Sequence, residues 1–305
     1  RLPAALSGPS DRVAMSFTSR IARALVAHGI TTDPDSWLGE ACRSVEAAVV
    51  EAGALSNVEI RERVPLVRGQ VPVGSGTWSQ DVHISPWVCT LLSVQGRLLR
   101  GEPTGRWTAP RPRWHPTEAW LGEPIRRSEP RSAFAELVRL WLERFGPGTA
   151  DDIVWWLGAT KGIVRTALAD VSALEVGLDD GGTGYVLPDD ADDEPEVEPW
   201  AALLPVLDAT TMGWKGRGFY LDAADVPYLF DTNGNAGTTA WWDGRIVGCW
   251  VQDDAGRVRV LTRHALPKAA VRALRVEEER LTTWLGGTRV RTGFSSRQLE
   301  GDPLE

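Results

Sequence analysis

The sequence predicts an α+β fold: tandem winged helix-turn-helix domains, followed by a C-terminal β-rich, barrel-like domain with a terminal helix. Two observations predict it. A series of helix, capped short helix, third helix and hairpin occurs twice, and short strands joined by Asp-Gly and Ala-Gly turns follow in the last third of the chain. The 305 residues, 43% of them hydrophobic, suffice for two or more domains with a sizeable core.

The first predicted elements are helices. Residues 18–29 have helical spacing and end in a glycine. Residues 33–53 form the next predicted helix, because apolar residues recur there at helical spacing and Asp35 or Ser36 can cap it. We expect a further, short helix within residues 54–65.

Two turns with one pattern indicate an internal duplication. Each has a helix-ending glycine, two further residues, a capping hydroxyl, an acid three residues later and then an isoleucine. The matched pairs are Gly53 and Gly146, Ser56 and Thr149, Glu59 and Asp152, and Ile60 and Ile153. A hydroxyl and an acid at this spacing form a capping box, in which each side chain bonds a free amide at the helix start. Chance seldom repeats cap, spacing and hairpin together, so we expect two winged helices.

The other elements follow from periodicity and turn residues. In the first copy they are a third helix over residues 81–96 and a hairpin over 97–113 that turns near 103–105. In the second copy they are a third helix over 160–171 and a hairpin over 174–188 that turns at 180–182. After them come an acidic linker over 188–199, a buried strand over 200–208, a β meander over 238–263 with turns at 243–244 and 255–256, a helix over 267–286 and a tail.

These elements divide the chain into four segments. They are the end of an N-terminal winged helix over residues 1–30, a winged helix over 31–130, a second one over 131–188 and the β-rich domain over 189–305. The chain begins at Arg1 rather than at a methionine, so we expect further residues upstream, removed by processing, truncation or disorder.

The composition argues against several classes of protein. No apolar stretch approaches the ~20 residues of a membrane span, and no signal-peptide pattern is present. Cys42, Cys89 and Cys249 lie far apart in apolar stretches, so we expect reduced core residues. The four histidines lack ligand spacing, and no nucleotide-binding motif occurs, so we expect neither a metal nor a cofactor.

The net charge of −8 hides two basic regions. Residues 189–198 hold seven acids and no base, whereas residues 97–131 hold eight arginines against four acids. Residues 257–291 hold nine bases against three acids. Arginine supplies nearly all of the positive charge, which suits bidentate contact with phosphate. The alternative explanation for the many arginines is a genome whose base composition favours arginine codons.

Four segments resemble one known family, and the resemblance covers nearly the whole chain. They read FGPGTADDIVWWLG, LLPVLDATTMGWKGR, LFDTNGNAG and DGRIVGCW. The family is that of the winged-helix DNA glycosylases, the AlkZ-like proteins. The resemblance implies three tandem winged helices, a β-barrel-like domain and an N-glycosylase that removes bulky or crosslinking alkylated purines. It also implies double-stranded DNA as partner, a monomer without cofactor, and a bacterial, cytoplasmic, nucleoid-associated protein.

The sequence departs from this family at the catalytic motif. The resemblance implies a pair of polar residues around one apolar residue in the first winged helix, commonly Gln–x–Gln or a variant with His or Asp. The five glutamines of this chain never lie two positions apart, and no His–x–Gln occurs. Only two winged helices can be counted from Arg1 onward. We therefore expect the catalytic residue upstream of Arg1.

Within the chain, Asp208 is a candidate for aligning the attacking water. It ends a predicted strand beside Trp214, Lys215 and Arg217, and a glycosylase needs a carboxylate or an amide beside the sugar. The alternative is that Asp208 caps the following turn. The three neighbouring side chains are candidates for base stacking and phosphate contact, or belong to a solvated loop.

The other candidate DNA contacts lie on the first wing and on the third helix of the second copy. The wing residues are Arg97, Arg100, Arg106, Trp107, Arg111 and Arg113, for which an ordinary basic surface strand is the alternative. Lys161 and Arg165 lie four apart and share a helix face, whereas the apolar residues of that helix must be core. Trp155 and Trp156 cannot face the same way, so we expect one in the core and the other between domains.

Three functions remain open. The first is a DNA N-glycosylase, and the second is a non-catalytic DNA-binding protein on the same scaffold, such as a regulator or a lesion sensor. The third is an interaction protein whose winged helices bind no DNA, because fold does not fix function. The composition of residues 231–237 predicts a turn. This turn either has a structural role only or approaches a DNA backbone.

Overall fold

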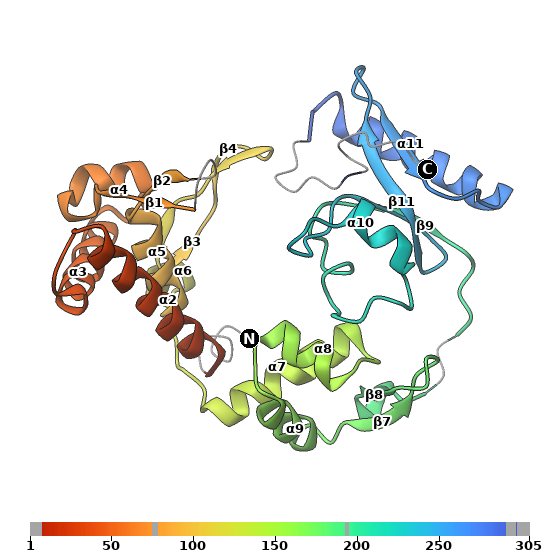
Figure 1. Ribbon diagram of the computed structural model, residues 1–305, viewed down its shortest axis with the longest axis horizontal. Helices are drawn as coiled ribbons and strands as arrows, with labels where there is room; N and C mark the ends of the chain where they lie inside the picture. The colour runs from red at the N-terminus through yellow and green to blue at the C-terminus, as the bar shows by residue number, and fades with distance from the viewer. Residues whose placement is uncertain (1–7, 75–78, 193–194, 291–296, 298–305) are drawn as a thin grey trace. The chain divides into compact units, whose positions relative to one another are not determined.

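The computed structural model describes residues 8–74, 79–192, 195–290 and 297. The chain divides into two compact units (Figure 1). Unit 1 comprises Arg1–Leu140 and Gly162–Val171, and unit 2 comprises Trp141–Lys161 and Ser172–Glu305. The segment predicted as a second winged helix, residues 131–188, therefore contributes to both units. The predicted domain boundaries stay predictions.

Unit 1 is mainly helical. Its helices are α2 (Gly8–Ala27), α3 (Pro34–Ala52), α4 (Asn57–Arg63), η1 (Pro65–Val67), α5 (Ser85–Val94), α6 (Thr117–Leu121), the first part of α7 (Pro130–Phe145) and most of α9 (Lys161–Asp170). The first four α-helices share one core, in which Leu25, Val45, Ile60 and Leu92 are fully buried. The helices predicted over residues 18–29, 33–53 and 54–65 are thus confirmed, although the first begins earlier than predicted. The second is capped by Asp33, which accepts the Ser36 amide, and not by Asp35 or Ser36 as predicted.

Both predicted capping boxes are confirmed. The Ser56 hydroxyl accepts the Glu59 amide at 3.3 Å, and the Glu59 carboxylate accepts the Ser56 amide at 2.7 Å. Thr149 and Asp152 form the same reciprocal pair at the start of α8 (Ala150–Leu157). A cap of this kind contributes about 1 kcal/mol to helix stability. Local side-chain chemistry therefore sets where both short helices begin.

The first copy contains a hairpin that the sequence did not predict. Strands β1 (Gln70–Val73) and β2 (Gln80–His83) pair antiparallel before the third helix. Residues 81–83, predicted as helix, are therefore strand, and α5 begins only at Ser85, followed by Pro86 in its first turn. Val71 is fully buried in the core of unit 1, which fixes the hairpin there by tertiary packing rather than by local propensity.

The wing of the first copy is longer than predicted and turns elsewhere. Its strands are β3 (Leu98–Arg100), β4 (Thr104–Arg106), β5 (Ala109–Arg111) and β6 (Trp114–Pro116). Because Arg106 pairs with Ala109, the tip is the two residues Trp107 and Thr108, so the turn predicted near 103–105 was wrong. The glycine at position 105 suggested the turn. Gly105 does have a positive φ of +95, but it lies within a strand.

The second copy matches its prediction closely. The third helix is α9, and the hairpin consists of β7 (Leu174–Gly177) and β8 (Thr183–Val186), which confirms the turn at 180–182. The acidic stretch after it contains the short helix η3 (Pro188–Asp190), and its described residues are exposed, as expected of a solvated linker.

Unit 2 is built on a four-stranded antiparallel sheet of order β12-β11-β10-β9. The strands are β9 (Ala201–Leu204), β10 (Thr239–Trp242), β11 (Arg245–Gln252) and β12 (Val258–Thr262), which confirms the predicted meander. The strand predicted over residues 200–208 is shorter, because it ends at Leu204, so Asp208 does not end a strand. Helix α11 (Lys268–Leu285) covers one face, around Trp250 and Leu274. The loop between β9 and β10, with η4 (Ala223–Asp225) and α10 (Val226–Leu229), covers the other face, around Tyr220 and Trp241.

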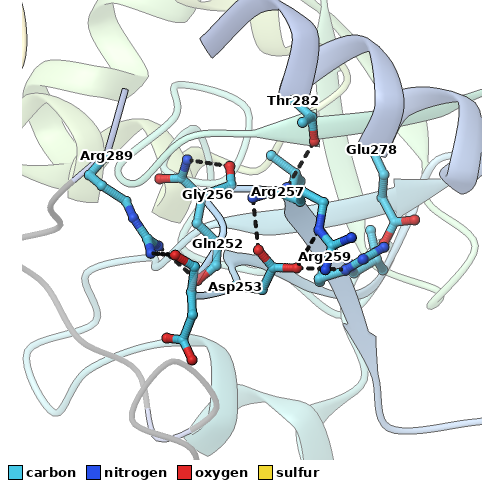
Figure 2. A network of polar contacts seen from close by, with 11 residues as sticks. Gln252, Asp253, Gly256, Arg257, Arg259, Glu278, Thr282 and Arg289 are labelled. Atoms are coloured by element: carbon cyan, nitrogen blue, oxygen red, sulfur yellow. Dashed lines mark hydrogen bonds and ion pairs between the residues drawn. The ribbon is translucent and has the colours of Figure 1, made fainter. Parts of the chain in front are cut away.

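The described strands of unit 2 form an open sheet rather than a closed barrel. Side chains of α11 satisfy the outward amides of the edge strand β12: Thr282 accepts the Val258 amide at 2.8 Å, and Glu278 accepts the Val260 amide at 2.5 Å (Figure 2). An edge covered in this way has no free amides at these positions to pair with a further strand. The barrel-like closure expected from the sequence is therefore not seen in the described residues.

Candidate nucleic-acid interface

The tip of the first wing presents two arginines and a tryptophan to solvent. All residues of β4 and β5 are exposed, including Arg106 and Arg111. Trp107, at the turn between them, is 59% exposed. Such a hairpin holds cationic and aromatic side chains away from the core, where a nucleic-acid backbone can reach them.

The arginines at the base of the wing have partners within the protein. Arg97 forms an ion pair with Glu46 of α3, and its Nε donates to that carboxylate at 3.0 Å. Arg113 donates to the Ala54 carbonyl at 2.7 Å and pairs with the capping residue Glu59 at 3.2 Å. These contacts fix the wing to the helices, so the geometry gives Arg97 and Arg113 a structural role. Their DNA contact stays a prediction.

Arg100 is intermediate between the exposed arginines of the wing tip and the paired arginines at the base of the wing. It is exposed, but its guanidinium sits 5.1 Å from the centre of the Trp114 ring, which is buried in the core of unit 1. A cation over an aromatic face is attracted by the ring quadrupole and still leaves the guanidinium edges open to solvent. Arg100 is thus positioned by the protein and is still available to a phosphate.

The second basic region is partly neutralised within unit 2. Asp253 accepts both the backbone amide and Nε of Arg257 at 2.9 Å, and Nε of Arg259 at 3.3 Å (Figure 2). Arg263 pairs with the buried Asp225 at 2.7 Å. The excess of bases over residues 257–291 therefore gives less free charge than the sequence count suggests.

Asp208 forms the turn that the alternative interpretation predicted. Its carboxylate accepts the Thr210 amide at 2.9 Å, and its carbonyl accepts the Met212 amide at 3.0 Å. A carboxylate that bonds the backbone two residues later is a standard turn device. This geometry supports the turn role over that of a catalytic base, and the catalytic assignment remains untested.

Asp152 organises the segment around Lys215 in a way that the sequence did not reveal. The residue is 4% exposed. One carboxylate oxygen accepts the amide and hydroxyl of Thr149 at 3.0 and 2.6 Å. The other accepts the amides of Lys215 and Gly216, both at 2.8 Å. Four donors satisfy this buried carboxylate, which would otherwise be costly to desolvate.

The candidates Trp214 and Arg217 lie in packed positions, whereas Lys215 is exposed. The Trp214 indole donates to the Phe145 carbonyl at 2.9 Å. The Arg217 guanidinium lies 4.6 Å from the Phe230 ring centre and 5.7 Å from that of Trp155. Trp214 and Arg217 therefore shape this surface, and the Lys215 ammonium is the group that can reach an external phosphate.

The third helix of the second copy is divided between core and surface largely as predicted, although Ile163, predicted as core, is only half-buried. Val164, Ala167 and Leu168 are buried, whereas Lys161 and Arg165 are exposed. The Lys161 ammonium lies 2.8 Å from Asp151, so one of the two predicted cations has an acidic partner. The DNA contact predicted for this helix stays a prediction.

Residues 231–237 form the predicted turn. The Asp231 carboxylate accepts the amides of Asn233 and Asn235 at 2.9 and 2.8 Å and the Asn235 side-chain amide at 2.7 Å. Gly234 has φ +80, a conformation that glycine adopts readily. This network accounts for the composition of the segment by structure alone.

Three further observations bear on chemistry. The three cysteines are buried free thiols, as predicted. Among the described residues, no group of three or more histidine, cysteine, aspartate or glutamate side chains is arranged to hold a metal ion. None of the helices in the described part of the chain is long and apolar enough to cross a bilayer.

Comparisons with known proteins identify the family. The family model for DNA glycosylase AlkZ-like proteins matches residues 13–284, so the chain belongs to the AlkZ-like DNA glycosylase family. Among solved structures, the chain is similar to the Streptomyces sahachiroi DNA glycosylase AlkZ, with a TM-score of 0.62 and 18% sequence identity over 88% of this chain and 70% of that one. A search of curated proteins finds no match.

Proposed function

We propose that this chain binds double-stranded DNA as part of a DNA N-glycosylase that removes bulky or crosslinking alkylated purines. The family supports the reaction class. The observation that carries DNA binding is the exposed wing tip, with Arg106, Trp107 and Arg111. The repeated order of helix, capped helix, third helix and hairpin supports two tandem winged helices as the scaffold.

The wing suits phosphate contact for physical reasons. Arginine presents a planar fork of donors that matches phosphate oxygens, and two such side chains on a short hairpin can neutralise neighbouring backbone charges. These contacts carry no sequence information, so the wing would hold duplex DNA of any sequence. An enzyme that acts on damaged bases needs this property, because its lesions occur throughout the genome.

The experiment is a titration of duplex DNA at several salt concentrations, with Arg106→Ala and Arg111→Ala combined. We expect weaker binding to every duplex and a salt dependence of log K that is flatter by about 1 to 2 units. Arg23→Ala with Arg43→Ala is the matched control, because these arginines are exposed on α2 and α3 of the same unit. An unchanged affinity in the wing variant would show that the wing is not the contact surface.

Two other functions are tested by the same titration together with an assay for abasic sites. Salt-dependent binding without base excision by the full-length protein would favour a non-catalytic regulator or lesion sensor. Binding to no duplex at any salt concentration would favour an interaction protein. One structural observation favours the non-catalytic alternative: the Asp208 carboxylate is bonded within a turn.

A further inference from the structure

We infer that the exposed rings of Trp156 and Phe219 in unit 2 stack against unpaired bases of bound DNA. Within a larger group of packed aromatic rings, they belong to a row in the order Trp156, Phe145, Trp214 and Phe219. Consecutive ring centres lie 6.3, 5.2 and 5.1 Å apart. This inference rests on the proposed function, because it requires a chain that binds DNA.

The inner and outer members of the row differ in burial. Phe145 and Trp214 are half-buried, and the Trp214 indole is anchored by its bond to the Phe145 carbonyl. Trp156 and Phe219 are 45% and 59% exposed. Aromatic rings contribute most to stability when they are buried, so exposed rings connected to a packed aromatic row are candidates for a binding site. The sequence predicted one of Trp155 and Trp156 in the core, but Trp155 is also exposed, at 40%.

Two exposed cations lie beside the Trp214 and Phe219 end of the row. Lys215 follows Trp214 directly and is exposed. Arg245 donates to the Phe219 carbonyl at 2.7 Å and is itself exposed. On the acidic side, Asp151 pairs with Lys161, and Asp152 is buried. The charged residues named here are three cations and two acids, so their sum is positive, which favours an anionic occupant.

Exposed aromatic rings interleaved with cations favour unpaired nucleotides over other ligands. Every base has a π-face, so stacking tolerates any base, and the cations hold the backbone beside it. Bases within a duplex already stack on their neighbours, so these rings gain most from a base that is extruded or unpaired. The surface would therefore take an unpaired base in either orientation of the strand and with little regard to its identity.

The anchored loop keeps the two rings in place. Asp152 fixes the backbone at Lys215 and Gly216, four residues or fewer before Phe219, through two bonds of 2.8 Å. The Phe219 ring also packs edge-on against Tyr220, with centres 4.8 Å apart. A preformed stacking surface loses less entropy on binding than a flexible one.

The test compares a fully paired duplex with the same duplex carrying one bulged purine, by fluorescence anisotropy. We expect the 305-residue chain to prefer the bulged duplex. Trp156→Ala and Phe219→Ala should each reduce that preference by about fivefold or more, as for the loss of one base–aromatic stack, and leave affinity for the paired duplex little changed. Trp200→Ala is the control, because Trp200 is 43% exposed in the same unit and outside the row.

Conservative variants keep the test valid if an alanine variant unfolds. Phe219→Leu retains apolar volume without a ring and should lose the preference, whereas Trp156→Tyr retains a ring and should keep most of it. A bulge preference that survives in the Trp156→Ala, Phe219→Ala double variant would overturn the inference while leaving DNA binding intact. A chain that binds neither duplex would overturn both this inference and the proposed function.

Discussion

At the scale of single residues, Asp152 joins two segments of unit 2 through its buried carboxylate. It caps α8 with one carboxylate oxygen and holds the Lys215 loop with the other. We expect Asp152→Asn to lower the free energy of unfolding by about 2–3 kcal/mol, because an amide cannot accept all four bonds and leaves a buried donor unpaired. Urea unfolding followed by tryptophan fluorescence measures this loss.

Asp151 provides the control for that substitution. It precedes Asp152 in the same helix, but its side chain is exposed and pairs with Lys161, which is exposed too. Exposed ion pairs contribute little in water, so Asp151→Asn should leave the unfolding midpoint almost unchanged. Equal losses in the two variants would mean that helix charge, and not the buried network, stabilises this region.

The two roles of Asp152 show what sequence reasoning can and cannot find. The cap was predictable, because the hydroxyl and acid lie three residues apart in a known pattern. The second role joins residues 63 and 64 positions apart, and no local pattern encodes that pairing. The candidate residues Trp214, Lys215 and Arg217 were found as a group for their chemistry, but their burial depends on packing that only the fold reveals.

At the scale of elements, the capping box of α4 makes a pH-dependent contribution to stability. Bonds from the Ser56 backbone and hydroxyl, and the nearby Arg113, hold the pKa of Glu59 below its usual value of 4.5. A carboxylate with a depressed pKa in the folded state stabilises the protein above its unfolded pKa. That contribution is lost as pH falls through the folded value.

Glu59→Gln tests this contribution. We expect the variant to be less stable than the wild type at pH 7, and the difference in unfolding free energy to shrink steadily below about pH 4.5. Glu62→Gln serves as the comparison, because Glu62 is exposed on the same helix and outside the capping box. A difference that stays constant from pH 7 to pH 3 would mean that the Glu59 charge does not stabilise the helix.

Elements with local signals were predicted, and elements fixed by tertiary contacts were not. The Asp243–Gly244 turn and the caps at Ser56 and Thr149 are encoded by adjacent residues, and the structure has them where expected. The hairpin of β1 and β2 was missed because its position depends on burying Val71 in the helical core. The wing tip was misplaced because Pro103 and Gly105 are typical turn residues, whereas Gly105 lies inside β4.

At the scale of the whole molecule, DNA binding and base excision need not reside in the same residues. The chain belongs to a DNA glycosylase family, yet its 305 residues contain no Gln–x–Gln or His–x–Gln pattern. Asp208, the acid that the sequence offered as a catalytic candidate, holds a turn. The described residues thus support binding and positioning more directly than they support hydrolysis.

This separation predicts the outcome of an excision assay. We expect the 305-residue chain to bind an alkylated duplex and to leave no abasic sites, because an N-glycosylase needs a carboxylate or an amide aligned with water at the sugar. Gel analysis after alkaline cleavage of abasic sites measures release. If sites do appear, Asp208→Asn decides between the two roles of that residue. The control is Asp231→Asn, which alters a comparable turn. If Asp208→Asn abolishes base release and Asp231→Asn does not, Asp208 is catalytic, and binding and excision are not separated.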